Sequence, residues 1–215
     1  MKNIVLYSPP AAGKGTQCEV LVKNYGYDVI SIGQVLRNQR NPETEIGKVI
    51  IETQDKGILT PDDIVAKALC AELEKYKNNP IIVEGYPRNF EQAKLLDNIL
   101  NNYIVINMDI SREDACKRVL GRINCKQCNR IYNINYLDTA PKVGGICDDC
   151  GAELDSRSDD NEHSFNVRFD VYEKNAPLIL DYYKSKGILY KVDSSVSKDF
   201  TTNQITDILN RFKND

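Results

Sequence analysis

The tetrapeptide Gly-Lys-Gly-Thr at residues 13–16 brings together the groups that bind nucleotide phosphates. It follows an apolar segment at residues 4–8 and begins a helical pattern. A helix N-terminus presents free N–H groups and a partial positive charge to an anion. Lys14 adds an ammonium that can reach the terminal phosphates, and Thr16 adds a hydroxyl for Mg²⁺. The stretch predicts a phosphate loop, although Gly15 stands where the general pattern has Ser or Thr.

Two Cys-x-x-Cys pairs indicate a metal site. Eighteen residues separate the pair Cys125 and Cys128 from the pair Cys147 and Cys150. Four thiolates at this spacing complete a tetrahedral site typical of Zn²⁺ or iron, with no position left for catalysis. The segment between the pairs holds few apolar residues, so we expect it to need a structural metal to fold. The remaining cysteines lie in helical patterns and are expected to be buried: Cys18, Cys70 and Cys116.

Phosphoryl transfer needs cations around the phosphates, a metal ion and exclusion of water. Basic residues lie at predicted element ends or beside the cysteines, where their side chains can converge on a cleft. They are Lys14, Arg37, Arg88, Arg118, Arg122, Arg157 and Arg168. A single arginine on a helix is usually solvated, so this set gains weight only from the motifs around it. The single histidine, His163, lies beside acidic residues and is expected at the surface.

The elements that must position these groups alternate between apolar strands and helices. Strands are predicted at 4–8, 29–32, 80–84, 103–109 and 189–193. Helices are predicted at 14–25, from 33, at 44–56, 61–77, 90–101, 111–122, 162–185 and 203–213. Pro177 is expected to bend or split the helix at 162–185. This order predicts an α/β fold with a parallel five-stranded sheet covered on both faces, and ligands at the carboxyl ends of the strands.

Composition narrows the class of protein. The chain has 215 residues, 41% of them hydrophobic and 27% charged, as in a soluble domain with insertions. The net charge of −3 gives no electrostatic footprint for nucleic acid. No apolar run approaches 18 residues, so we expect no membrane span. Because Met1 lies directly before the first strand and no export signal stands out, we expect a cytoplasmic protein without a disulfide framework.

Several motifs resemble those of the long-type adenylate kinases, which have a metal-bearing lid, and the resemblance spans nearly the whole chain. The stretch at 8–16 is similar to the family's phosphate loop. Residues 31–37 resemble the start of its AMP-binding insert, and residues 85–88 resemble its second AMP motif. Arg118 and Arg122 match the motif at the entry to the lid. The motif at the lid exit is matched by Arg157, Asp159, Asp160 and Arg168.

The resemblance implies transfer of the γ-phosphoryl group of Mg-ATP to AMP by a monomer, with Mg²⁺ bound to ATP and Zn²⁺ in the lid. It implies a P-loop core at 1–30, 61–122 and 161–215, a helical monophosphate-binding insert at 31–60 and a zinc-ribbon-like lid at 123–160. The implied catalytic residues are Lys14, Arg88, Arg122, Arg157 and Arg168. The implied ATP-binding residues are Pro10, Ala11, Ala12, Gly13, Lys14, Gly15, Thr16, Arg118, Arg122 and Tyr132. The implied AMP-binding residues are Ile32, Arg37, Gly85, Arg88, Gln92, Arg157 and Arg168, with Gln92 reading the adenine.

Five positions depart from the family pattern and leave the magnesium geometry and the turnover open. Ser8 and Ala11 replace glycines, Ile32 replaces Thr, and Gln34 and Glu84 each replace Asp. An alanine in a left-handed conformation costs about 1–2 kcal/mol. Two consecutive prolines also stiffen the entry to the loop. We therefore expect the loop to relax into a conformation that alanine accepts.

Three other functions remain open at this point. A kinase for UMP or CMP is the nearest, but Gln92 followed by Ala93, together with the long metal lid, favours AMP. The departures at Ala11, Gln34 and Glu84 allow a nucleotide-binding protein with little activity. A zinc-ribbon nucleic-acid binder is disfavoured, because acidic residues balance the basic ones in the cysteine segment.

Overall fold

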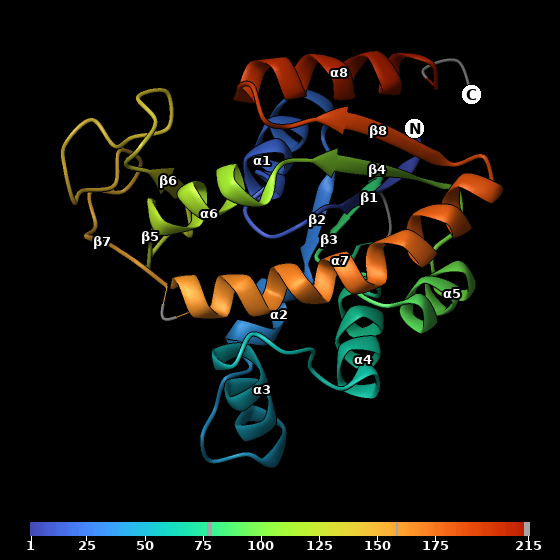
Figure 1. Ribbon diagram of the computed structural model, residues 1–215, viewed down its shortest axis with the longest axis horizontal. Coiled ribbons are helices and arrows are strands. Elements are labelled where there is room, and N and C mark those ends of the chain that lie inside the picture. Colours follow the sequence, from blue (N-terminus) through green and yellow to red (C-terminus); the bar gives the residue numbers. More distant parts are fainter. Residues whose placement is uncertain (77–78, 158, 213–215) are drawn as a thin grey trace.

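Five short strands rich in Ile and Val form the central parallel sheet of the computed structural model, which describes residues 1–76, 79–157 and 159–212 (Figure 1). In spatial order they are β2 (Asp28–Ser31), β3 (Ile81–Glu84), β1 (Asn3–Tyr7), β4 (Tyr103–Asp109) and β8 (Leu189–Asp193). Every neighbouring pair is parallel. The predicted α/β class and its five-stranded parallel sheet are confirmed.

Within residues 1–76, 79–157 and 159–212, eight helices connect the strands or follow them. They are α1 (Lys14–Tyr25), α2 (Ile32–Asn38), α3 (Glu45–Asp55), α4 (Asp62–Leu73), α5 (Phe90–Ile99), α6 (Arg112–Leu120), α7 (Glu162–Ser185) and α8 (Lys198–Asn210). In the part of the chain that the structure describes, no helix combines the length and the apolar composition of a membrane span.

Strand β1 shows why the sheet is covered on both faces. Its successive side chains point to opposite faces. Val5 packs in a core cluster that includes Leu96 of α5, whereas Ile4 packs in a second cluster that includes Leu21 of α1. Both Val5 and Ile4 are fully buried, which explains why successive residues of the strand are apolar. Because helices cover both faces, ligands can bind at the carboxyl edge of the sheet, where the loop after β1 begins.

Two predicted helix boundaries are wrong. Helix α8 begins five residues earlier than predicted, because the Ser197 side chain caps it by accepting from the Phe200 N–H at 3.1 Å. Helix α4 ends at Leu73 rather than near Lys77, which lies outside the described residues, as does Lys213 at the predicted end of α8.

Of the expected effects of Pro177, splitting of the helix is wrong, and one expectation about the cysteines is wrong as well. Helix α7 runs unsplit through Pro177, which lies on its exposed face, so water can reach the carbonyl that lacks a helical partner. Its neighbours Ala176 and Ile179 are buried and hold the helix on the core. Among the free cysteines, Cys18 is buried as expected, but Cys70 is exposed because it lies on the outer side of α4.

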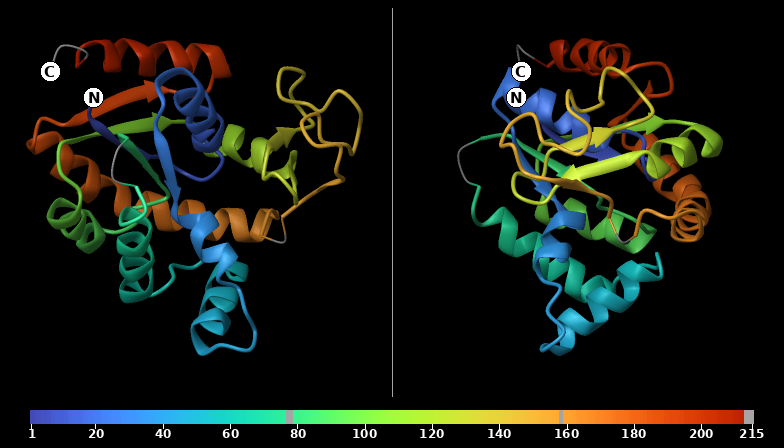
Figure 2. Two further views of the ribbon diagram at one scale, coloured as in Figure 1. Left: turned by 180° about the vertical axis from the view of Figure 1, so that it is seen from behind. Right: turned by 90° about the vertical axis from the view of Figure 1, so that its left-hand side faces the viewer.

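Two segments project from the core at separate places (Figure 2). One carries α2 and α3, within the expected insert. The other is the cysteine segment, where a second, antiparallel sheet forms from β6 (Ile131–Asn133), β5 (Arg122–Cys125) and β7 (Leu154–Asp155). Arg122, predicted at a helix end, is instead the first residue of β5. It therefore lies where the chain passes from the core into the cysteine segment.

Candidate active site

The loop between β1 and α1 keeps a left-handed turn. Ala11 has φ 60° and Gly13, directly before α1, has φ 91°. The expectation that the loop relaxes away from this conformation is therefore wrong. Ala12 is 1% exposed and packs in the core. This packing helps to hold the loop in its left-handed conformation despite the local strain at Ala11.

Lys14 folds back over this loop. Its Nζ donates to Ser8 Oγ at 2.6 Å and to the Pro9 carbonyl at 3.1 Å. Burial lowers the pKa of the Lys14 ammonium to about 8, although the Glu84 carboxylate opposes this effect. Ser8, which replaces a glycine of the family pattern, thus holds the lysine. A bound phosphate would bring negative charge close to this ammonium and favour its charged form.

The residue that follows Lys14 lies close to the cysteine segment. A Cβ on Gly15 would lie 2.9 Å from Cδ1 of Ile131, a residue of β6. The cysteine segment therefore lies close to the start of α1. A Ser or Thr at position 15 would require the flexible end of the Ile131 side chain to shift, whereas Thr16 provides a hydroxyl that lines the larger cavity beside the loop.

Two cavities meet beside Lys14. The larger has a volume of about 790 Å³ and the smaller about 150 Å³. Seven residues line both of them: Ala11, Lys14, Ser31, Arg37, Glu84, Arg122 and Arg157. Of the described residues that line both cavities, four are basic and one, Glu84, carries a carboxylate. Such an arrangement can hold anionic groups that enter from both sides and bring them into contact.

The residues expected to bind ATP mostly line the larger cavity. They are Ala11, Ala12, Gly13, Lys14, Gly15, Thr16, Arg118, Arg122 and Tyr132. Pro10 instead lines the smaller cavity, together with Arg37, Gly85, Arg88, Arg157 and Arg168 of the expected AMP set. Ile32 is 1% exposed and Gln92 is 2% exposed, and neither lines a cavity.

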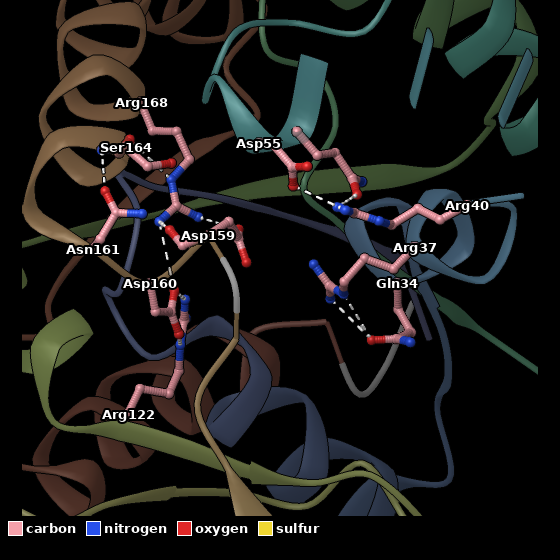
Figure 3. Close-up of polar contacts among 11 residues, drawn as sticks. Gln34, Arg37, Arg40, Asp55, Arg122, Asp159, Asp160, Asn161, Ser164 and Arg168 are labelled. Atoms are coloured by element: carbon pink, nitrogen blue, oxygen red, sulfur yellow. Dashed lines mark hydrogen bonds and ion pairs between the residues drawn. The ribbon is translucent and has the colours of Figure 1, made fainter. Parts of the chain in front are cut away.

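Two arginines at the junction are held by acids that follow the cysteine segment (Figure 3). Arg122 Nε donates to Asp160 Oδ2 at 2.7 Å, and its Nη2 donates to the other oxygen of the same carboxylate. Arg168 Nη1 donates to Asp159 Oδ2 at 2.8 Å, and its Nη2 donates to the Asp159 carbonyl at 2.8 Å. The paired acids hold both guanidinium groups in place before any ligand arrives.

The other arginines are less well compensated. Burial, with Arg122 and Arg37 nearby, lowers the pKa of Arg157 to about 10. Arg37 is held by a neutral group, since Gln34 Oε1 accepts from its Nε at 3.1 Å and its Nη2 at 2.9 Å (Figure 3). Gln34, which replaces an Asp of the family pattern, therefore orients Arg37 without neutralising it.

The aromatic wall of the larger cavity contains a residue that the sequence analysis missed. Tyr136 lines this cavity, and the guanidinium of Arg118 lies over its ring, 5.7 Å from the centroid. Tyr132 also lines the cavity, but its hydroxyl points to the cysteines and lies 3.5 Å from Cys147 Sγ. The spacing from Arg118 gives no signal for Tyr136, because the turn that follows β6, in which the Tyr136 N–H donates to the Asn133 carbonyl, brings this ring to the arginine.

The four cysteines come together as their spacing predicts. Their sulfur atoms all lie within 4.8 Å of one another, with Cys125 and Cys150 3.4 Å apart and Cys128 and Cys147 3.5 Å apart. Tetrahedral Zn–S bonds of about 2.3 Å place sulfurs about 3.8 Å apart, so the cluster fits such an ion. A hydrogen bond from the Tyr132 hydroxyl lowers the pKa of Cys147 to about 6, which favours the thiolate that a metal binds.

Comparison with known proteins gives one consistent family. The family model described as adenylate kinase matches residues 6–188. An adenylate kinase of Caldanaerobacter subterraneus is 40% identical over 203 residues, covering 92% of this chain and 91% of its own length. Adenylate kinases of Archaeoglobus fulgidus and Thermodesulfovibrio yellowstonii are 36% and 37% identical, and each alignment covers at least 97% of both chains.

Proposed function

The chain belongs to the adenylate kinase family and is a nucleoside monophosphate kinase, and we propose how its residues move a phosphoryl group from Mg-ATP to AMP. ATP occupies the larger cavity and AMP enters the smaller one. The observation that carries this assignment is the shared lining of the two cavities at Lys14, Arg122 and Arg157. A group held on one side of that junction can pass to the other without entering water.

The transfer is direct and in line. The attacking oxygen of a monophosphate is already anionic, so no general base is needed. Catalysis then depends on positive charge around the phosphate that moves. We assign this role to five side chains at or beside the junction: Lys14, Arg88, Arg122, Arg157 and Arg168. Arg122 and Arg168 are oriented in advance by Asp160 and Asp159, which reduces the reorganisation needed during the reaction.

The larger cavity is of a size that suits a whole nucleotide. Its phosphate end is the loop at residues 11–16, and its far end contains Arg118 and Tyr136. A planar base fits beside such a pair, because it can stack on the ring or on the guanidinium. We place the adenine of ATP there. Tyr132 forms the wall behind it rather than the stacking surface, since its hydroxyl is used within the cysteine cluster.

Mg²⁺ fits beside Glu84. This carboxylate lines both cavities, and its Oε2 accepts from Ser31 Oγ at 2.5 Å. Oxygen donors are what this hard cation prefers, and it usually keeps several waters. Glu84 and the Thr16 hydroxyl would hold the ion through such waters. When bound, Mg²⁺ neutralises charge on the ATP phosphates.

We further propose that residues 31–60 and 123–160 act as the insert and the lid that exclude water on closure. The contact between Gly15 and Ile131 supports a lid that reaches the phosphate loop. Zn²⁺ bound by the four cysteines would hold the lid in shape. Because one chain provides both cavities, the reaction needs no second copy, and we propose a monomer that works in the cytoplasm.

A coupled assay of ADP formation tests the assignment. With ATP fixed, we expect AMP to be a far better acceptor than UMP or CMP. Arg168→Ala should lower kcat by about 100-fold or more, as expected for loss of one transition-state donor. Arg112→Ala is the matched control, since Arg112 contacts Asp170 and Glu173 on α7 and lines neither cavity. Equal rates with UMP, or equal losses in the two variants, would contradict the proposal.

A further inference from the structure

We propose that Asp62 is a positioning residue that determines base selectivity, because it fixes the orientation of the Gln92 amide. The inference rests on the proposed function, in which Gln92 reads the adenine of AMP. Asp62 is the first residue of α4, and Gln92 lies in the first turn of α5. Thirty positions separate them along the chain, yet their side chains are in contact.

Four hydrogen bonds define the arrangement. Gln92 Nε2 donates to Asp62 Oδ1 at 2.7 Å. Gln92 Oε1 accepts from the Arg88 backbone N–H at 2.7 Å. Asn89 Nδ2 donates to both oxygens of Asp62, at 3.0 and 3.1 Å, and keeps the carboxylate facing Gln92. Hydrogen bonds thus hold both the NH₂ group and the oxygen of the Gln92 amide. Gln92 as a whole is 2% exposed.

The two partners of Gln92 permit only one orientation of its amide. An ionised carboxylate accepts hydrogen bonds and cannot donate, whereas a backbone N–H donates and cannot accept. If the amide turned over, its oxygen would face the Asp62 carboxylate and its NH₂ group would face the Arg88 N–H. Both contacts would then be repulsive, and two part-buried hydrogen bonds would be lost.

The fixed amide has one donor and one acceptor left. An amide NH₂ group offers two hydrogens and its oxygen two lone pairs, and the network uses one of each. A 6-amino purine presents a donor at position 6, which the remaining lone pair of Gln92 can accept. A 6-oxo purine presents an acceptor there, which would meet the oxygen of Gln92. The orientation set by Asp62 therefore favours AMP over a 6-oxo nucleotide such as IMP.

The amide is oriented before the base arrives. Gln92 lies behind the residues that line the smaller cavity, so a base reaches it once the neighbouring insert shifts. Asp62 and Arg88 both belong to the expected core rather than to the insert. Their hydrogen bonds to Gln92 can persist during that shift, and selectivity does not depend on rearranging the amide.

The test measures kcat/KM for AMP and for IMP with ATP held constant. Asp62→Ala should lower the AMP-to-IMP ratio by about tenfold or more, mainly through a higher KM for AMP, and should leave the KM for ATP unchanged. Asp62→Asn keeps one acceptor oxygen and should retain most of the ratio. Asp63→Ala is the matched control, because it removes a charge from the same helical turn. The Asp63 carboxylate forms an ion pair with Lys67.

A second variant covers the case in which Asp62→Ala does not fold. Asn89→Asp keeps the oxygen that caps α5 by accepting from the Gln92 N–H, but it replaces the donor that holds Asp62 with a repelling carboxylate. It should lower the same ratio. A purely structural role for Asp62 would lower the melting temperature and leave the ratio unchanged.

The outcomes separate this inference from the proposed function. If the parent enzyme does not prefer AMP to IMP, the placement of Gln92 against the base is wrong and the inference is overturned with it. If the parent prefers AMP and Asp62→Ala or Asn89→Asp retains that preference, only the role of Asp62 is overturned. An equal loss of preference in Asp63→Ala would also overturn it, since the effect would then come from charge alone.

Discussion

Ala11 offers a sharp test of the phosphate loop, because it takes a left-handed conformation that glycine adopts freely. Its φ is 60°, and Ala11 lines both cavities. The substitution Ala11→Gly removes only a methyl group and keeps every N–H of the loop. We expect it to stabilise the free protein and to leave the affinity for ATP unchanged, since the loop already has the shape that binds phosphate.

The size of the effect follows from two opposing terms. Relief of the left-handed strain gains about 1–2 kcal/mol. The greater freedom of glycine in the unfolded chain costs about 0.5–1 kcal/mol. With mid-range values of both terms, the free energy of unfolding should rise by about 0.75 kcal/mol, which corresponds to an increase in Tm of about 1.5–3 °C for a chain of this size.

The neighbouring alanine provides the control. Ala12 is 1% exposed, packs in the core and has no left-handed backbone to relieve. Ala12→Gly should lower the free energy of unfolding by about 1–2 kcal/mol, from the lost methyl burial and the added chain entropy. Thermal denaturation of both variants, followed by circular dichroism without ligand, measures the difference. A Tm for Ala11→Gly equal to or below that of the parent would refute the strain argument.

Three further predictions concern the metal, the lysine and the base of ATP. Purified protein should contain about one Zn²⁺ or iron per chain. Replacing Cys125 and Cys128 together by Ser should release this metal and lower the Tm. Cys70→Ser, at an exposed thiol outside the cluster, should do neither. Because the pKa of Lys14 is lowered to about 8, the free enzyme is half deprotonated there at pH 8. Binding of ATP restores the ammonium and should take up about half a proton at this pH. Calorimetry in buffers of different ionisation enthalpy measures this uptake, and the Lys14→Met variant should bind ATP without it. Tyr136→Ala should raise the KM for ATP by about tenfold and leave that for AMP unchanged, and equal changes would contradict the placement of the ATP base.

The parts of this molecule that sequence predicts well depend on local or periodic signals. The strands around Val5 and Val83 are apolar runs that could be buried only between two helical layers. The cysteine pairs meet because each pair already holds its two thiols close, so only one long-range contact remains to form. The phosphate loop needs one strand, one turn and one helix, all contiguous in the chain.

The parts that sequence analysis missed depend on contacts between distant elements. Nothing near Gln92 indicates that Asp62 will hold its amide, because α4 and α5 are far apart in the sequence and come into contact only in the folded chain. Similarly, Tyr132 and Tyr136 differ by one helical turn in spacing, but both lie outside helices, and the cysteine cluster draws the first hydroxyl to itself. The conformation of Ala11 was mispredicted because the burial of Ala12 and the bonds of Lys14 were not available to weigh against the strain.

The departures from the family pattern gain meaning from the charge of the junction. Six basic side chains gather at or beside it: Lys14, Arg37, Arg88, Arg122, Arg157 and Arg168. Among the described residues three carboxylates oppose them, namely Glu84, Asp159 and Asp160, so this group of side chains has an excess of three positive charges. An aspartate at position 34 would reduce this excess to two. Gln34 thus keeps Arg37 oriented while leaving its charge for the monophosphate.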